Sequence, residues 1–349
     1  MAQKLTSLAA LAALPFDEII DVRAPSEYAE DHIPGAINLP VLSDAERARV
    51  GTIYVQQDRF LARKVGAALV ARNAAGHLEG PLSDRGGGWR PLVYCWRGGQ
   101  RSGSFASILA QIGWRVELIA GGYKSYRRLV VQALYDRPLP HRLILLDGGT
   151  GTAKTRFLAR LESMGAQVID LERMAGHRGS LLGGMAGGQP SQKSFESRLA
   201  MTLARCAPAQ PVFVEAESNK IGRLILPPML WQAMNAAAHI MIAAPLAARA
   251  RYLTRAYGDL LADTELLCAR LAQLRAYHGA EQVEAWQQMA QAGSYESLAA
   301  ELVARHYDPR YRKAQARHGR APLAAIELPG LEDADLDAAL PAILAAAGA

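Results

Sequence analysis

The sequence has few cysteines, and those that it has lie far apart. Only Cys95, Cys206 and Cys268 occur among its 349 residues. This spacing excludes a disulfide framework and the paired spacing of a cysteine-based metal site. It fits a reducing compartment in which a reactive thiol survives, so we expect a cytoplasmic protein.

The sequence also lacks a long apolar run. No segment approaches the roughly 20 apolar residues of a membrane-spanning helix, and we expect no membrane partner. Residues 8–14 are apolar and invite comparison with a secretory signal, but Asp17 and Glu18 follow at once and no small-residue cleavage pattern is evident. We therefore expect a short N-terminal helix there.

Length and composition indicate a globular protein of two domains. Half of the residues are hydrophobic, and the formal net charge is +6 at pH 7. This charge permits a nucleic-acid partner but does not require one. Pro138 and Pro140 stop a helix and stiffen the chain. The sequence therefore predicts a first domain over 1–138 and a second over 141–349.

One stretch of the first domain carries a candidate nucleophile. The apolar residues 92–94 predict a strand that ends at Cys95, and a helical pattern follows a short glycine-containing loop. Loop N–H groups and the positive end of the helix favour a thiolate. We predict that Cys95 is catalytic together with Arg97 and Arg101. The alternative is a buried structural cysteine, which would leave both arginines beside an inert apolar group.

This stretch resembles the active-site loop of rhodanese domains, which carry sulfur or selenium on that cysteine as a persulfide or perselenide. Asp21–Arg23 and residues 32–40 resemble the two upstream rhodanese signatures, in the right order. The resemblance implies a rhodanese-like α/β first domain. We expect Asp21 and Arg23 to form an ion pair that braces the fold rather than to act in catalysis.

The second domain opens with a phosphate-binding pattern. An apolar strand over 143–147 precedes a glycine-rich segment, and an amphipathic helix follows. This order is typical of a P-loop, whose backbone N–H groups and helix N-terminus hold phosphate oxygens. A glycine-rich turn without a ligand is the alternative. The predicted phosphate-binding residues are Gly148, Gly149, Thr150, Gly151, Thr152, Ala153, Lys154 and Thr155.

Three P-loop positions have distinct expected roles. Lys154 supplies positive charge to the phosphates, and Thr155 reaches a magnesium ion when one is present. Ala153 stands where a P-loop usually has glycine. Its methyl group fits if the residue is already helical and crowds a phosphate otherwise.

Further residues of the second domain are candidates for the same site. The apolar strand over 211–215 ends in acids, and Glu215 and Glu217 are predicted to orient a magnesium-bound water, the alternative being simple polarity at a strand end. Arg249, Arg251 and Arg255 either cover the phosphate site or are solvated.

Two basic segments are candidate RNA surfaces. Residues 305–320 are rich in arginine, with Tyr307 and Tyr311 interleaved, which suits phosphate neutralisation and base stacking. Residues 121–128 form a competing surface, and a solvated charged helix is the alternative for both. The predicted substrate or RNA contacts are Arg178, Ser180, Arg223, Arg310, Arg312 and Lys313.

The combination of a rhodanese-type loop and a P-loop in one chain resembles the bacterial tRNA 2-selenouridine synthase family. A tryptophan beside the cysteine, here Trp96, is typical of that family. Further matching stretches are 51–54, 95–102, 121–124, 177–180, 189–192, 215–218 and 221–223. The resemblance implies a rhodanese-like α/β domain followed by a P-loop NTPase-like parallel α/β domain with a helical, basic C-terminal region.

The resemblance also implies a two-stage reaction at the wobble uridine of tRNAs for Lys, Glu and Gln. Geranyl diphosphate alkylates the sulfur of 2-thiouridine, and selenium from selenophosphate, supplied by selenophosphate synthetase, then replaces the S-geranyl group. Cys95 would handle the selenium. No cofactor is expected to bind tightly and no resident metal is expected, with Mg²⁺ as an optional ligand.

Two other functions remain open on the sequence alone. One is a rhodanese sulfurtransferase fused to a small-molecule kinase, and the other is a nucleotide-switched RNA-binding protein. The P-loop pattern does not distinguish ATP from geranyl diphosphate, because both present a diphosphate.

Overall fold

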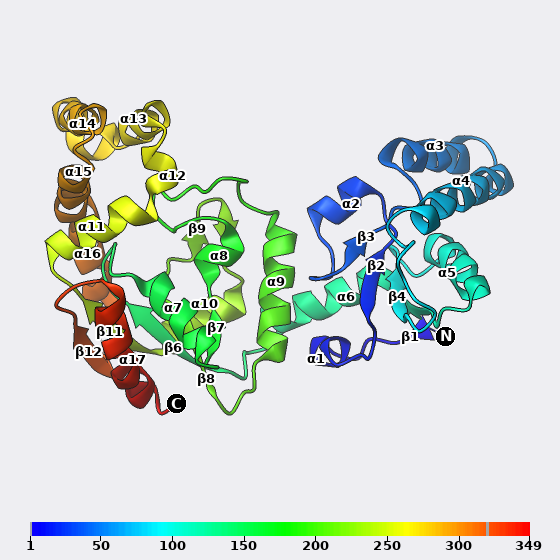
Figure 1. Cartoon of the computed structure of the whole chain (residues 1–349), viewed down its shortest axis with the longest axis horizontal. Coiled ribbons are helices and arrows are strands. Elements are labelled where there is room, and N and C mark those ends of the chain that lie inside the picture. The colour runs from blue at the N-terminus through cyan, green and yellow to red at the C-terminus, as the bar shows by residue number, and fades with distance from the viewer. Residues whose placement is uncertain (1, 319–320) are drawn as a thin grey trace. The chain divides into compact units, whose positions relative to one another are not determined.

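The computed structural model describes residues 2–318 and 321–349, which fall into two compact units (Figure 1). The first unit comprises the chain up to Arg137 together with Pro190–Arg205, and the second comprises the remainder. The sequence-based boundary placed all of 141–349 in the second domain. Helix α9 (Gln192–Arg205) instead groups with the first unit, because it packs against α1 (Leu8–Ala12) and α6 (Gly122–Val131).

A five-stranded parallel sheet forms the centre of the first unit. Its strand order is β1 (Ala2–Gln3), β5 (Glu117–Ile119), β4 (Pro91–Tyr94), β2 (Glu18–Asp21), β3 (Ile37–Asn38). The remaining helices are α2 (Pro25–Glu30), α3 (Asp44–Gln56), α4 (Arg59–Glu79), α5 (Gln100–Ile112) and the π-helical turn η1 (Gln132–Asp136). Apolar residues of β4 and α5 share one buried core, so the end of β4 is rigidly placed.

The expected N-terminal helix is confirmed. Helix α1 begins after Ser7, whose hydroxyl accepts a hydrogen bond from the N–H of Ala10 at 3.0 Å. Its apolar residues Leu8 and Leu11 are buried.

The second unit contains another five-stranded parallel sheet. Its order is β12 (Ala324–Glu327), β11 (Ala238–Ala243), β6 (Arg142–Asp147), β8 (Pro211–Glu215), β7 (Gln167–Ile169). Helices α7 (Lys154–Ser163) and α17 (Asp333–Ala347) contribute to the core of this sheet. Because the strand order reverses at β6, ligands are expected at its carboxyl end. The predicted fold class is confirmed in both units.

The second unit also has a helical part with its own apolar core around the fully buried Trp286. Its helices are α11 (Leu246–Ala256), α12 (Gly258–Leu261), α13 (Thr264–Ala272), α14 (Arg275–Gln291), α15 (Tyr295–Leu302), η2 (Val303–Tyr307) and α16 (Asp308–His318). Short elements complete the unit: α8 (Leu171–Ala175), β9 (Lys220–Ile221), β10 (Leu224–Ile225) and α10 (Pro228–Ala236).

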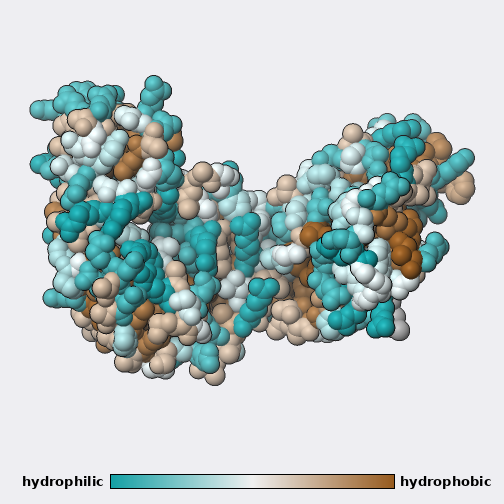
Figure 2. Space-filling model, viewed as in Figure 1, coloured by the Kyte–Doolittle hydropathy of each residue, from teal (hydrophilic) through white to brown (hydrophobic). Residues whose placement is uncertain are grey.

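The visible face of each unit carries many polar residues (Figure 2). Figure 2 shows hydrophilic residues over much of the visible face, with hydrophobic residues in smaller groups. Within the described part of the chain, no helix combines the length and the apolar character needed to cross a membrane.

Candidate functional site

Cys95 follows the last residue of β4 and precedes α5, as the strand–loop–helix pattern predicts. Its side chain is buried, and its sulfur accepts hydrogen bonds from the Ser102 hydroxyl at 3.1 Å and from the Gly99 N–H at 3.3 Å. Burial acts to raise the pKa of the Cys95 thiol, but these donors and the charge of Arg101 outweigh it, and the pKa lies below its usual value. The site therefore favours the nucleophilic thiolate.

The two predicted arginine partners differ in their surroundings. Arg101 is mostly buried and donates a hydrogen bond to the Glu27 carboxylate at 2.8 Å. Its charge still acts on the Cys95 thiol. Arg97 is exposed on the loop itself.

A second loop holds the cysteine loop in place. The N–H groups of Tyr123 and Lys124 donate to the carbonyl oxygens of Cys95 and Trp96 at 2.9 and 3.1 Å. Gly122 has a positive φ of 57°, and a Cβ atom there would collide with the Cys95 carbonyl oxygen. The Tyr123 ring stacks on Trp96 with centroids 5.2 Å apart. The Gly-Gly-Tyr-Lys stretch at 121–124 is thus a support for the nucleophile loop.

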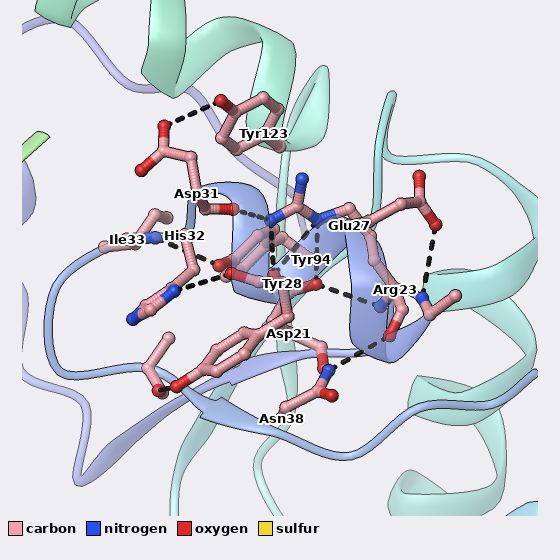
Figure 3. A network of polar contacts seen from close by, with 12 residues as sticks. Asp21, Arg23, Glu27, Tyr28, Asp31, His32, Ile33, Asn38, Tyr94 and Tyr123 are labelled. Atoms are coloured by element: carbon pink, nitrogen blue, oxygen red, sulfur yellow. Dashed lines mark hydrogen bonds and ion pairs between the residues drawn. The ribbon is translucent and has the colours of Figure 1, made fainter. Parts of the chain in front are cut away.

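The predicted ion pair between Asp21 and Arg23 is confirmed. The Arg23 guanidinium lies 2.6 Å from the Asp21 carboxylate, and both side chains are fully buried. The same guanidinium donates to the Asp31 carbonyl oxygen at 2.6 Å and lies over the Tyr123 ring at 4.1 Å (Figure 3). The pair therefore joins β2 to the support of the cysteine loop, consistent with a bracing role.

The side chain of Asp31 extends this buried group of contacts. Its carboxylate accepts hydrogen bonds from the Tyr123 hydroxyl at 2.7 Å and the Ser197 hydroxyl at 2.9 Å (Figure 3 shows the first). Burial raises the pKa of Asp31 despite these donors and the nearby Arg127. Arg127 itself binds the carboxylate of Glu196. It is thus an internal brace of the first unit, whereas the sequence placed it on a basic outer face.

The P-loop connects β6 to α7 and borders a cavity of about 750 Å³. Seven of the eight predicted phosphate-binding residues line this cavity, and the exception is Gly149, which lies against the guanidinium of Arg249. The Lys154 ammonium donates to the Gly148 carbonyl oxygen at 2.7 Å, so it lies folded over the loop. This geometry gives an anion both the N-terminus of α7 and a cation.

Ala153 departs from the helical conformation that would accommodate its methyl group. It has φ 60° and ψ 28°, in the left-handed region, directly before α7 begins at Lys154. Among the described residues it is the one non-glycine residue with positive φ. For an L-residue this conformation costs about 1–2 kcal/mol, so the loop carries backbone strain that glycine would relieve.

Arg249 of α11 braces the P-loop, which is one of the two alternatives that the sequence left open for this residue. Its Nε and Nη2 donate to the Thr150 carbonyl oxygen at 2.9 and 2.7 Å, and Nη2 also contacts the Asp308 carboxylate at 2.6 Å. The neighbouring Arg251 and Arg255 form exposed ion pairs instead. Of the three arginines, only Arg249 covers the loop.

The acids at the strand ends divide into two groups. Glu217 lines the cavity, and burial together with the negative charge of Glu172 raises its pKa to about 8. Glu215 does not line it; its buried carboxylate accepts a hydrogen bond from the Glu172 N–H at 2.7 Å. Glu172, which the sequence analysis missed, lines the cavity and accepts a hydrogen bond from the Thr155 hydroxyl at 3.0 Å.

This donor set fits a magnesium ion shared with a phosphate ligand. Thr155, Glu172 and Glu217 supply the oxygen atoms that Mg²⁺ prefers, and the ion usually takes only one or two protein carboxylates in phosphate sites. In the described chain, no group of three His, Cys, Asp or Glu residues is arranged to hold a metal alone. A bound ion would neutralise charge on a diphosphate.

The predicted substrate contacts separate into cavity and surface residues. Arg178 and Ser180 line the P-loop cavity with Arg310. Arg178 pairs with Asp259 at 2.7 Å, and the Ser180 hydroxyl lies 2.8 Å from that of Tyr257.

Arg223 lies away from this cavity and binds Gln189 through its backbone N–H at 2.7 Å and its side chain. Arg312 and Lys313 are exposed on α16, and Arg312 borders a neighbouring cavity of about 720 Å³.

The tyrosines of the basic segment lie at the P-loop cavity. The Tyr311 hydroxyl donates to the Asp147 carboxylate at 3.0 Å, and Tyr307 lines the P-loop cavity. Both side chains are half-buried and Tyr311 lines the same cavity, so base stacking by these rings stays a prediction. Arg320 lies outside the described residues.

Comparisons with known proteins match both units. Residues 4–129 match the family described as Rhodanese-like domain, and residues 141–267 match that described as tRNA 2-selenouridine synthase AAA domain. The tRNA 2-selenouridine synthase of Nitrosomonas europaea is 39% identical over 236 residues, or 66% of this chain and 61% of that protein. That of Hahella chejuensis is 38% identical, over 68% of this chain and 63% of that protein.

A third relative is matched over most of its length. The tRNA 2-selenouridine synthase of Alcanivorax borkumensis is 34% identical over 325 residues, which cover 84% of this chain and 88% of that protein. The alignments with the first two relatives span less than two thirds of those proteins, whereas the third spans both units.

Proposed function

The chain belongs to the tRNA 2-selenouridine synthase family, and from this membership we propose that it converts 2-thiouridine at the tRNA wobble position to 2-selenouridine. The tRNAs for Lys, Glu and Gln are its proposed substrates. The structural support is one chain that carries both a buried cysteine with a lowered pKa and a P-loop cavity. Each site suits one of two successive reactions.

The P-loop site is assigned to the first reaction, which is geranyl transfer. The sulfur of 2-thiouridine attacks C1 of geranyl diphosphate, a carbon–sulfur bond forms, the carbon–oxygen bond breaks, and diphosphate leaves while the uridine loses its N3 proton. Lys154 and the N-terminus of α7 stabilise the charge that develops on the leaving diphosphate. A magnesium ion on Thr155 and Glu172 would add to this stabilisation.

Cys95 is assigned to the second reaction, which is selenium transfer. The selenium of hydrogen selenophosphate attacks C2 of the S-geranyl nucleoside, the C2–S bond breaks, and geranylthiol leaves with the proton of the selenophosphate. Water then attacks phosphorus, the Se–P bond breaks, phosphate leaves, and the remaining proton of that water goes to N3. Alkylation makes this departure feasible, because a thiocarbonyl sulfur is itself a poor leaving group. The N–H of Gly99, the Ser102 hydroxyl and Arg101 favour negative charge at Cys95, and Arg97 is exposed beside it. Selenophosphate synthetase is the proposed source of the selenium donor.

The lowered pKa of a buried cysteine beside a loop of hydrogen-bond donors is the observation on which the selenium step depends. The test is mass spectrometry of wobble nucleosides from 2-thiouridine tRNA incubated with protein, geranyl diphosphate and selenophosphate. The expected products are S-geranyl-2-thiouridine followed by 2-selenouridine.

A variant separates the two steps. Cys95→Ser should form no 2-selenouridine and should accumulate the S-geranyl nucleoside, because a hydroxyl has a far higher pKa than a thiol. Cys206→Ser is the matched control and should form both products, since burial raises the pKa of that thiol. Normal selenation by Cys95→Ser would refute the assignment of this cysteine.

A further inference from the structure

A second cavity adjoins the P-loop cavity inside the second unit. It measures about 50 Å³ and shares four lining residues with the larger cavity, namely Thr150, Leu253, Tyr257 and Tyr307. Its remaining lining residues are Leu182, Thr254, Leu260, Leu261, Leu267, Tyr295, Leu298, Ala299 and Leu302. The two cavities therefore adjoin each other at these shared residues.

The lining of the second cavity is apolar. It includes seven leucines, and two of its tyrosine hydroxyls already have partners: Tyr295 donates to the Leu261 carbonyl oxygen at 3.2 Å, and Tyr257 lies 2.8 Å from Ser180 Oγ. A nucleoside presents ribose hydroxyls and base edges, which need hydrogen-bond partners when they are buried. A hydrocarbon needs none, so this lining suits a hydrocarbon chain.

The apolar wall begins at the phosphate loop itself. A Cβ atom on Gly151 would lie 2.9 Å from Leu253 Cγ, so the leucine packs directly on the loop backbone. The same helix, α11, binds the loop through Arg249. Leu181 and Met185 also line the P-loop cavity although 41% and 37% of each is exposed. A bound chain would cover this exposed apolar surface.

We propose that the prenyl chain of the diphosphate substrate runs from the P-loop along Leu253 and Tyr257 and that its terminal carbons enter the second cavity. This inference rests on the proposed geranyl transfer and assigns the residues that recognise the chain. A cavity of about 50 Å³ is too small for ten carbons, so most of the chain lies in the larger cavity. Leu267, Leu298 and Leu302, which line the second cavity and are buried in the helical core, limit its length.

Binding measurements with diphosphates of different tails test this assignment. Calorimetry compares inorganic, dimethylallyl, geranyl and farnesyl diphosphate on the whole chain. Since each buried methylene contributes about 0.8 kcal/mol, geranyl diphosphate should bind the wild-type protein at least about tenfold more tightly than inorganic diphosphate.

A matched pair of variants on α15 tests the cavity. Ala299→Leu fills it, whereas Ala300→Leu adds the same side chain one position along, outside the lining. Ala299→Leu should lose most of the preference for geranyl over inorganic diphosphate and keep its affinity for inorganic diphosphate. Ala300→Leu should keep both the preference and the affinity. Thermal unfolding checks that each variant is folded.

A second test enlarges the cavity, so it does not require extra atoms to fit into a packed core. Leu298→Ala removes a lining residue, and Leu271→Ala removes an equally buried leucine of the same core that does not line the cavity. Only Leu298→Ala should shift the preference toward farnesyl diphosphate, by several-fold.

The outcomes separate this proposal from the one on which it rests. If inorganic and geranyl diphosphate bind the wild-type protein equally, or if folded Ala299→Leu matches Ala300→Leu, the chain site is wrong and the diphosphate site stands. If Leu298→Ala and Leu271→Ala have the same chain preference, the length limit is wrong. If ATP binds and no prenyl diphosphate does, the proposed function itself fails.

Discussion

The Ser102 hydroxyl lies 3.1 Å from the sulfur of Cys95 and connects the first turn of α5 to the nucleophile. A hydrogen bond to a charged group contributes about 1.5–3 kcal/mol, and this one favours the thiolate over the thiol. Ser102→Ala should therefore raise the pKa of Cys95 and slow its alkylation by iodoacetamide at neutral pH roughly tenfold. Ser107→Ala, which removes a hydroxyl bound to Gly103 on the same helix, should leave the alkylation rate unchanged. Equal rates for both variants would contradict the role of Ser102.

Lys154→Ala should separate the two proposed reactions. The change removes the cation at the P-loop, and a charge-assisted phosphate contact contributes about 1.5–3 kcal/mol, so affinity for geranyl diphosphate should fall at least about tenfold. Geranyl transfer should fail, while selenation of supplied S-geranyl tRNA should persist at least partly. Arg156→Ala on the same helix removes an arginine paired with Asp333 and serves as the control. If geranyl transfer and selenation both proceed normally in Lys154→Ala, the P-loop is not the diphosphate site.

Ala153→Gly should stabilise the protein, although glycine usually destabilises helices. The left-handed backbone at Ala153 costs an L-residue about 1–2 kcal/mol. This cost exceeds the loss of stability that glycine causes by giving the unfolded chain more conformational entropy. We expect the free energy of unfolding to rise by up to about 1 kcal/mol. Ala159→Gly, the same change inside α7, should lower it by about 1 kcal/mol. Denaturant unfolding measures both, and two changes of the same sign would contradict the strain at Ala153.

Glu217 should make stability depend on pH. Burial and the charge of Glu172 raise its pKa to about 8, so the folded protein holds a proton that the unfolded chain releases near pH 4.5. Stability should therefore fall as pH rises from 5 to 8. Glu217→Gln removes the free-energy cost of ionising this buried carboxyl group, and its advantage over wild type in the free energy of unfolding should grow by roughly 3–4 kcal/mol between pH 5 and pH 8. The exposed Glu281→Gln should show no such trend in thermal unfolding. A constant difference across this range would refute the shifted pKa.

Local patterns explain why much of both sites could be predicted from the sequence. The strand, the glycine-containing loop and the helix around Cys95 are consecutive, as are those around Lys154, so hydrophobic periodicity and motif spacing suffice. The ion pair of Asp21 and Arg23 spans two residues and was predicted for the same reason.

Contacts between distant segments could not be predicted in this way. Arg249 binds Thr150, which lies 99 residues away, and Asp31 binds Ser197, which lies 166 residues away. Nothing in the local sequence around α9 indicates that it packs with the first unit. The sequence around Tyr311 showed alternating cations and aromatics, but which face of the helix is buried depends on Asp147, far along the chain.

The basic residues of α16 remain the proposed tRNA surface, and the half-buried Tyr307 and Tyr311 line the P-loop cavity. Arg312 and Lys313 are exposed, whereas Arg310 also donates to His306 Nδ1 at 2.8 Å and lies over the Tyr277 ring. Changing all three to alanine should weaken tRNA binding and reduce the slope of log affinity against log salt by about 0.7–0.9 for each phosphate that is no longer neutralised. Folding should survive, because exposed charges contribute little to stability.

A second variant compares this surface with its competitor in the first unit. Lys124 and Arg128 are the exposed cations of 121–128, since Arg127 is held internally by Glu196. If α16 is the main tRNA-binding element, the α16 triple variant should reduce the salt slope more than the double variant Lys124→Ala and Arg128→Ala. The reduction should be larger for the α16 variant even when it is divided by the number of charges removed. The reverse order would move the tRNA-binding surface to α6. A triple variant whose salt titration superimposes on that of the wild type would exclude α16, because removing a cation that neutralises a phosphate must change the number of counterions released on binding.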